Sequence, residues 1–186
     1  RIIHKHSIRA VAHCGLIINT GSRDEKPKQQ GLAHFIEHVI FKGTTKRKAF
    51  HILSRMEDVG GEINAFTTKE ETCIYSSFMP QYYNRALELL QDITFNSTFP
   101  VKELNKEKAV IIDEINSYKD NPSEQIFDDF EEQLFDKHPI GKNILGTPKL
   151  VNSFNKYSIK EFITNHYHSQ QIVICSKGKT SFSKLI

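Results

Sequence analysis

The spacing of apolar residues changes several times along the chain, and each change predicts a switch between strand and helix. Residues 9–19 are rich in Val, Ile and Ala, which predicts a buried strand, with a shorter strand before it at residues 1–5. From Leu32 the apolar residues recur at intervals of three or four, which predicts a helix that ends at Gly43. A second helix is expected over residues 49–59.

The second half of the chain first alternates with a period of two and then returns to helical spacing. Residues 62–68 and 71–78 predict a β-hairpin. Four helical patterns and one more strand follow, at residues 82–93, 103–119, 123–135, 158–166 and 171–176. Residues 138–148 are expected to form a loop, and Ser158 with Glu161 forms a capping box that predicts the start of the last helix.

The order of these elements predicts the fold class. Two strands, two helices, two strands, four helices and a final strand do not alternate as the elements of a doubly wound parallel sheet do. The sequence therefore predicts an α+β fold, with an antiparallel or mixed β-sheet and helices packed on one face. At 186 residues, 38% of them hydrophobic, the chain has the size of one domain with its own core.

Composition excludes several classes of protein. No stretch approaches 18 uninterrupted apolar residues, so no membrane span is expected. The net charge of +3 is too small to indicate nucleic acid or an anionic membrane as the main partner, and the basic run at residues 42–48 is interpreted as a solvated loop. Cys14, Cys73 and Cys175 are too far apart for a disulfide framework or a CxxC metal site, and they are expected to be small buried residues.

The two ends of the sequence suggest a piece of a longer chain. The sequence begins at Arg1 with strand-like residues and no initiator methionine, and residues 178–186 follow the last strand without a closing element. We therefore expect residues 1–186 to be a single N-terminal domain, with the opening residues and the later domains of the full protein missing.

The first predicted helix carries a pattern typical of a metal site. His34 and His38 are four residues apart and share one face of the helix, which lets two imidazoles reach one tetrahedral Zn²⁺. Glu37 precedes the second histidine and is placed to take a proton from zinc-bound water as a general base. The pattern His-x-x-Glu-His is the zincin motif in reverse. Taken alone, the triplet is also compatible with an ordinary solvated helix face.

Further carboxylates come from the long helix predicted at residues 103–119. Glu107 and Glu114 are seven residues apart and share a face of that helix. A catalytic zinc ion needs a third protein ligand and one open position, and Glu114 fits the role of that ligand. Glu107 could support a histidine ligand through a hydrogen bond. A solvated helix face is the alternative for each glutamate.

At this point the sequence resembles the insulinase or pitrilysin family of zinc peptidases, which includes the mitochondrial processing peptidases. The resemblance spans most of the chain, and its motifs come in the family's order. They are Gly31-Leu-Ala-His34-Phe-Ile-Glu37-His38-Val-Ile-Phe-Lys-Gly43-Thr44, Gly60-Gly61-x-x-Asn64-Ala65-x-Thr67-x-x-Glu70-x-Thr72, Glu107-x-x-Val110-Ile-Ile-x-Glu114 and Gly141-x-x-Ile-Leu-Gly146-Thr147.

The resemblance implies a role for each residue of the metal pattern. It makes His34, His38 and Glu114 the ligands of one zinc ion per domain, Glu37 the general base and Glu107 a supporting carboxylate. The 75 residues between His38 and Glu114 are similar to the family's spacing.

The resemblance also implies how a peptide or an unfolded polypeptide is bound. The strand that holds Asn64 and Ala65 is expected at the edge of the sheet, where the substrate adds as a further strand. Phe66, like Phe41, is a candidate for lining a hydrophobic substrate pocket beside the zinc, with a place in the core as the alternative for either residue.

The sequence departs from the family in extent. Family members have two or four homologous domains that enclose a chamber, and a later domain supplies an Arg and a Tyr that grip the substrate. Nothing in these 186 residues resembles that half, so a second homologous domain or subunit is an expected partner. The family-based options for localisation are the bacterial cytoplasm or periplasm and the mitochondrial matrix.

The leading hypothesis is a zinc metalloendopeptidase domain that is weakly active as an isolated piece. The alternative is a non-catalytic peptide-binding or structural domain of the same fold, because one fold hosts several functions. A basic nucleic-acid module is a third reading, which the small net charge disfavours. Zinc content after purification would separate the first hypothesis from the other two.

Overall fold

The structure, a computed structural model, describes residues 1–186 and contains one five-stranded sheet. The strands are β1 (Ile2–His6), β2 (Ala12–Ile18), β3 (Glu62–Thr67), β4 (Thr72–Phe78) and β5 (Ile172–Gly178). Their order in the sheet is β1-β5-β2-β4-β3. The pair β1 and β5 is parallel and the other pairs are antiparallel, so the sheet is mixed.

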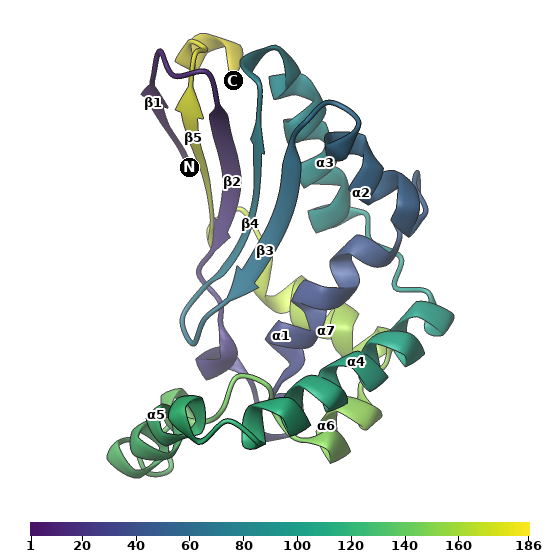
Figure 1. The fold of residues 1–186 in the computed structure, drawn as a ribbon, viewed down its shortest axis with the longest axis vertical. Coiled ribbons are helices and arrows are strands. Elements are labelled where there is room, and N and C mark those ends of the chain that lie inside the picture. Colours follow the sequence, from purple (N-terminus) through teal and green to yellow (C-terminus); the bar gives the residue numbers. More distant parts are fainter.

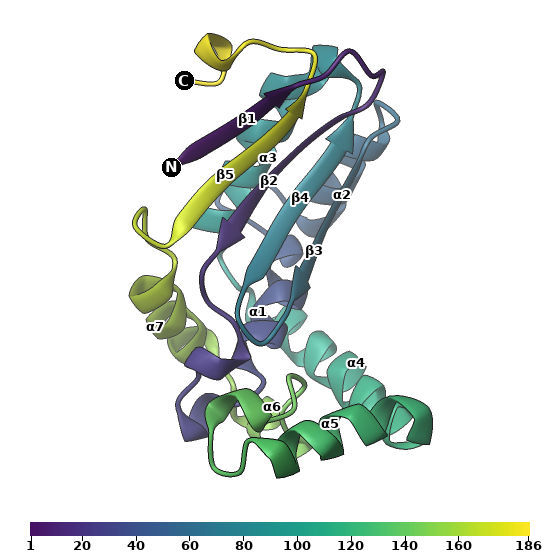
Figure 2. The ribbon, with the colours of Figure 1, turned by 90° about the vertical axis from the view of Figure 1, so that its left-hand side faces the viewer.

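Seven α-helices surround one side and one end of this sheet. They are α1 (Leu32–Val39), α2 (Ala49–Glu57), α3 (Tyr83–Phe95), α4 (Val101–Lys119), α5 (Pro122–Leu134), α6 (Pro148–Ser153) and α7 (Lys156–His166). Figure 1 shows α2 and α3 along one face of the sheet and α4, α5 and α6 beyond its lower end. Figure 2 looks onto the opposite face, which no helix covers. The prediction of an α+β fold with helices on one face is confirmed.

The core lies between the sheet and its covering helices because the strands alternate. In β2 the side chains of Ala12, Cys14, Leu16 and Ile18 are buried, whereas His13 is exposed. The covering helices bury Ile52, Met56, Ala86, Leu89, Leu90 and Ile93 in the same cluster. Burial of one such large apolar side chain stabilises the fold by about 1.5–3 kcal/mol. This packing holds the helical layer, and with it α1, against β3.

Three local predictions were wrong. The first concerns α6, which was not predicted, although Thr147 followed by Pro148 is a start signal: the Thr147 side chain accepts a hydrogen bond from the Leu150 N–H. The second concerns the start of α7, where Asn155 is the capping residue and Ser158 is its partner one turn inside the helix.

The third wrong prediction concerns the cysteines. Cys14 faces the covering helices and is buried, as expected. Cys73 and Cys175 are only partly buried, because their strand positions turn them toward the uncovered face. No helix of the structure combines the length and the apolar character that a membrane crossing requires.

Candidate metal centre

The two faces of helix α1 differ: one is apolar and packs in the core, and the other carries the polar side chains of the candidate site. Its apolar side chains are fully buried in the core cluster. His34 and His38 turn instead toward α4, where Glu107 and Glu114 face them. The i, i+4 spacing of the two histidines therefore does what the sequence predicts, since both rings lie on the same side of the helix with centroids 4.7 Å apart.

The N-terminus of α1 is fixed by a buried carboxylate from the preceding loop. Glu25 accepts hydrogen bonds from the backbone N–H of Gly31 at 2.8 Å and of Ala33 at 2.7 Å. Burial raises the pKa of Glu25 to about 8, although these hydrogen bonds oppose the shift. His34 is the third residue of the helix, so Glu25 holds the turn that carries it.

Two imidazoles and one carboxylate converge on a single point. His34 Nε2 lies 3.7 Å from Glu114 Oε1, and His38 Nε2 lies 3.6 Å from Glu114 Oε2. Nitrogen or oxygen atoms from the three residues all lie within 4.8 Å of one another. These separations are long for hydrogen bonds. They are close to the roughly 3.4 Å that separates two ligands of a tetrahedral zinc ion bound at about 2.0–2.1 Å.

The burial and the protonation state of His34 also fit a metal ligand. The residue is 8% exposed, and its Nδ1 has no hydrogen-bond partner. Burial lowers the pKa of His34 to about 4, so the ring is neutral at pH 7 and has a nitrogen lone pair for a cation. The nitrogen that faces Glu114 is Nε2, so a cation at the convergent point would take the Nε2 lone pair, and Nδ1 would still have no partner.

The charges around this point are unbalanced. Glu37, Glu107 and Glu114 bring three carboxylates, and the only Lys or Arg in ion-pair contact with any of them is Lys42. Two negative charges are thus left without a paired cation when all three are ionised. The donor set of two imidazole nitrogens and a carboxylate oxygen is one that Zn²⁺ accepts. Charge and donor chemistry therefore both fit a divalent cation.

Glu37 lies beside the two histidines without belonging to the convergent set. Burial raises the pKa of its carboxyl group, and the nearby Glu114 carboxylate adds to the shift. Glu37 lines a cavity of about 280 Å³. The other lining residues are His38, Phe41, Lys42, Leu53, Ile63, Asn64 and Glu107. A half-buried carboxylate that opens into a cavity next to the histidines has the placement of a base.

Glu107 and Lys42 form a pair that the sequence pattern only half revealed. Glu107 is 7% exposed, and its Oε2 lies 3.3 Å from His38 Nδ1. Its Oε1 lies 2.8 Å from Lys42 Nζ. The interpretation of residues 42–48 as a solvated loop is therefore wrong for Lys42 and also for Arg47, whose side chain is 15% exposed and paired with Glu88 and Asp92. The ion pairs depend on residues far away in the sequence, so a local charge pattern could not predict them.

The residues predicted to bind substrate are divided between two places. Strand β3 is at the edge of the sheet, next to β4 alone, and its Asn64 lines the cavity beside His38. Ala65 is buried. Phe66 is 43% exposed and its ring packs near Tyr75 at a centroid distance of 6.2 Å, so it is not among the cavity residues. Phe41, which the sequence offered together with Phe66, does line the cavity.

Comparison with known proteins agrees with this arrangement. The profile of the family described as "Insulinase (Peptidase family M16)" matches residues 1–148. The chain belongs to the M16 peptidase family. The resemblance noted in the sequence is therefore confirmed at the level of the family.

Relatives within the M16 family include proteins from bacteria and from mitochondria. The chain is 40% identical over 177 residues to a Bacillus subtilis protein named uncharacterized zinc protease YmxG, covering 95% of this chain and 43% of that protein. It is 34% identical over 186 residues to the β subunit of the Bos taurus mitochondrial-processing peptidase, covering 100% of this chain and 38% of that subunit. The chain thus spans less than half the length of these relatives.

A solved M16 structure shares the fold. The "inactive domain" of a peptidase M16 from Pseudomonas fluorescens superposes with a TM-score of 0.92, over 99% of this chain and 45% of that one. The sequence identity is 19%, so this likeness concerns the fold alone. It shows that the same architecture also occurs in a domain described as inactive, so the fold alone does not decide whether a given domain has a metal centre.

Proposed function

We propose that this chain is the metal-binding domain of a zinc-dependent endopeptidase. The convergence of His34, His38 and Glu114 is the observation that carries the proposal, because it brings two imidazoles and a carboxylate without a Lys or Arg partner to ligand spacing. In this proposal the three residues hold one Zn²⁺, and Glu37 stands beside it. Zinc, when bound, supplies a Lewis acid that polarises a carbonyl and lowers the pKa of water toward about 7.

Glu37 performs the proton transfers in this proposal. Its carboxylate accepts a proton from the attacking water and later donates it to the leaving amine of the cleaved peptide. The raised pKa of Glu37 supports this role, since a base with a pKa nearer to neutral both accepts and returns a proton readily. Glu107 contacts Nδ1 of His38 and thereby orients the imidazole.

The edge strand β3 supplies the proposed substrate platform. No strand pairs with its outer edge, so an extended polypeptide can add there once the Asn64 side chain releases the Ala65 N–H, and Asn64 lies at the cavity that holds Glu37 and His38. Asn64 and Ala65 would align the peptide through the backbone. Phe66 would also align the peptide through its backbone and not through its ring, because the ring lies near Tyr75 and does not line the cavity.

In this proposal, the other residues that bind the substrate belong to a second homologous domain or subunit. Residues 1–186 are then the N-terminal domain of the full protein. The relatives' greater length supports this assignment. The isolated piece should then cleave an unstructured peptide far more slowly than the whole protein, because misplacement of a substrate by about 1 Å can cost roughly a hundredfold in rate. Activity equal to that of the whole would argue against a missing partner.

The decisive experiment separates the base from the ligands in the full-length protein. Glu37→Gln should abolish hydrolysis of an unstructured peptide while the protein keeps about one zinc ion. His34→Ala, His38→Ala and Glu114→Gln should each lose the zinc, as measured by metal analysis after dialysis. Wild-type turnover in Glu37→Gln would contradict the role of the base, and equal zinc content in all variants would place the metal elsewhere.

The competing function is a peptide-binding or structural domain without catalysis. The likeness to a domain described as inactive is the observation in its favour. This chain has both histidines and Glu114 at ligand spacing with Glu37 beside them, an arrangement that a purely structural domain does not need. A wild-type protein that contains no zinc and still binds peptide would favour the competing function.

A further inference from the structure

Lys42 is the one Lys or Arg that forms an ion pair with a carboxylate of the candidate metal centre, and no part of the proposed reaction uses it. It ends the short 3₁₀ turn Ile40–Lys42 that follows α1. Its side chain is 28% exposed, and its Nζ lies 2.8 Å from Glu107 Oε1. Lys46, four residues later, is 57% exposed and lies 3.9 Å from Glu88. Lys42 is therefore set apart from the solvated part of the same basic run.

The Glu107 carboxylate divides its two oxygens between two partners. Oε1 faces Lys42, while Oε2 lies 3.3 Å from His38 Nδ1. A carboxylate only accepts hydrogen bonds, so this contact requires that His38 carry its proton on Nδ1. The lone pair of the neutral ring is then on Nε2, the nitrogen that lies 3.6 Å from Glu114 Oε2.

We propose that Lys42 is a positioning residue that makes Glu107 support His38 instead of binding the metal itself. This inference rests on the proposed zinc site. Glu107 and Glu114 are both on α4, and a carboxylate that contacts a ligand histidine would, if unpaired, be attracted to a divalent cation bound by that histidine. The ammonium group of Lys42 holds one oxygen of Glu107, so the other is left for the His38 N–H.

Burial makes the ion pair between Lys42 and Glu107 costly to break. The Glu107 side chain is 10% exposed, and removing one partner of a buried ion pair leaves an uncompensated charge. Without Lys42 the carboxylate has two ways to recover a cation: it can turn toward the zinc, or it can take up a proton. Either change removes the acceptor from His38 Nδ1. The predicted consequence is a weaker and less uniform zinc site.

A contact with substrate is the competing role for Lys42, because Lys42 also lines the cavity with Glu37, Phe41 and Asn64. The two roles differ in their dependence on Glu107. If Lys42 acts through Glu107, replacing Lys42 should have no further effect on zinc affinity once Glu107 has been replaced. A residue that binds substrate raises KM whether or not Glu107 is present, and it does not alter the affinity for zinc.

The test is a double-mutant cycle on zinc affinity in the full-length protein. Dissociation constants for zinc are measured by competition with a chelator for wild type, Lys42→Met, Glu107→Gln and the double variant. Lys42→Met should weaken zinc binding about tenfold or more, in the range known for partners of metal ligands. The double variant should bind no more weakly than Glu107→Gln alone. Lys42→Arg should stay within about threefold of wild type, since it keeps the charge.

The matched control is Lys46→Met, which removes a lysine of the same basic run without touching Glu107. It should leave zinc affinity unchanged. Additive effects in the cycle, or wild-type affinity in Lys42→Met, would overturn the role of Lys42 while the zinc site stands. A wild-type protein that binds no zinc would overturn the proposed function and this inference together.

A spectroscopic measurement reports on the contact between His38 Nδ1 and Glu107 without measuring zinc affinity or catalysis. Nitrogen-15 spectra of the histidine rings distinguish a proton on Nδ1 from a proton on Nε2. The zinc-loaded wild type and Lys42→Arg should show His38 protonated on Nδ1 in a hydrogen bond, and Lys42→Met should lose the hydrogen-bonded signal. An identical His38 signal in wild type and Lys42→Met would also contradict the proposal.

Discussion

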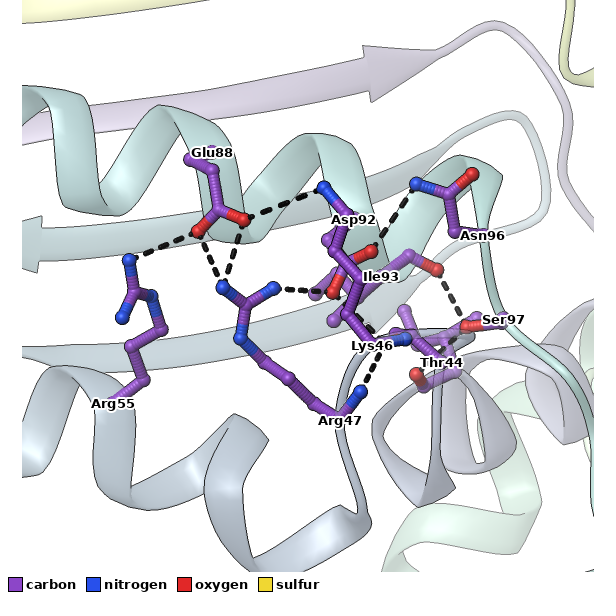
Figure 3. Close-up of polar contacts among 10 residues, drawn as sticks. Thr44, Lys46, Arg47, Arg55, Glu88, Asp92, Ile93, Asn96 and Ser97 are labelled. Carbon is purple, nitrogen blue, oxygen red and sulfur yellow. Dashed lines mark hydrogen bonds and ion pairs between the residues drawn. The ribbon is translucent and has the colours of Figure 1, made fainter.

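Two charged clusters on either side of the segment after α1 differ in how their charges are balanced. The first, called the metal cluster, consists of His34, Glu37, His38, Lys42, Glu107 and Glu114. The second, called the Arg47 cluster, consists of Thr44, Arg47, Arg55, Glu88, Asp92 and Asn96, and Figure 3 shows its contacts. Both connect this segment to a helix, α4 in the first case and α3 in the second.

The Arg47 cluster balances its charges, although Nε of Arg55 has no hydrogen-bond partner. Arg47 binds both oxygens of Glu88 at 2.8 Å and also pairs with Asp92, while Arg55 reaches Glu88 at 3.1 Å. Asp92 is fully buried, and its oxygens accept further hydrogen bonds from Thr44 and Asn96 (Figure 3). Two guanidinium groups therefore face two carboxylates, and Arg47 uses one terminal nitrogen for Glu88 and the other for Asp92.

The metal cluster does not satisfy itself. It has three carboxylates and one ammonium group, and Nδ1 of the buried His34 has no hydrogen-bond partner. The comparison shows that burial and ion pairs alone do not mark a functional site, since the Arg47 cluster has both. An unbalanced charge marks it, since an unpartnered buried nitrogen occurs in both clusters. The Arg47 cluster should therefore matter for stability, and the metal cluster for binding.

The largest expected effect on stability comes from removing Asp92. Asp92→Ala leaves the Arg47 guanidinium without its buried partner, so the free energy of unfolding should fall by about 3–5 kcal/mol. Urea denaturation of the metal-free protein measures this loss. The zinc affinity of the molecules that remain folded should be unchanged.

Two further variants keep that test informative. Asp92→Asn preserves the shape of the side chain and should cost less, about 1–3 kcal/mol, so it serves if Asp92→Ala does not fold. Lys46→Met removes an exposed partner of Glu88 and should change stability by less than about 1 kcal/mol. A loss of zinc affinity in Asp92→Asn as large as in Glu114→Gln would contradict the division between the clusters.

The two clusters also differ in what the sequence could reveal. His34 and His38 follow from a local rule, because residues four apart share a helix face. The α+β fold follows from the order of the elements. Glu114 could be proposed from its helix face, but its role came from the family resemblance, since no local rule states how α1 and α4 pack. Lys42 was misinterpreted for the same reason.

The Arg47 cluster had no sequence signal at all. Arg47 and Asp92 are 45 residues apart, and neither belongs to a motif with a known spacing. Their pairing depends on the segment after α1 lying against α3, which is decided by the packing of the core. Metal motifs are predictable because their chemistry fixes a spacing on one helix, whereas an ion pair between elements requires the tertiary fold.

The second prediction concerns zinc as a source of stability. A ligand that binds only the folded state at a hundred times its dissociation constant stabilises that state by about 2.7 kcal/mol. Wild type and Asp92→Asn should both gain this amount when zinc is added, and Glu114→Gln should gain nothing. The metal-free Glu114→Gln protein should be at least as stable as wild type, because it has one fewer unpaired carboxylate. Thermal or urea unfolding with and without chelator measures these differences, and zinc stabilisation of Glu114→Gln would place the binding elsewhere.

The smallest effect is a pH dependence that belongs to the Arg47 cluster. Burial alone would raise the pKa of Asp92, but hydrogen bonds from Thr44, Arg47 and Asn96 outweigh it and hold the pKa below its usual range. The unfolded chain, with an Asp pKa near 3.9, then binds the proton first as the pH falls. The stability from Asp92 is therefore complete above about pH 4 and is lost as the pH falls through the lower pKa of the folded state. The difference in unfolding free energy between wild type and Asp92→Asn should be constant from pH 7 to about pH 5 and should shrink below pH 4, when both proteins are measured without metal. A difference that stays constant into strong acid would mean that Asp92 is not held ionised by its partners, and that the Arg47 cluster is less self-sufficient than its geometry indicates.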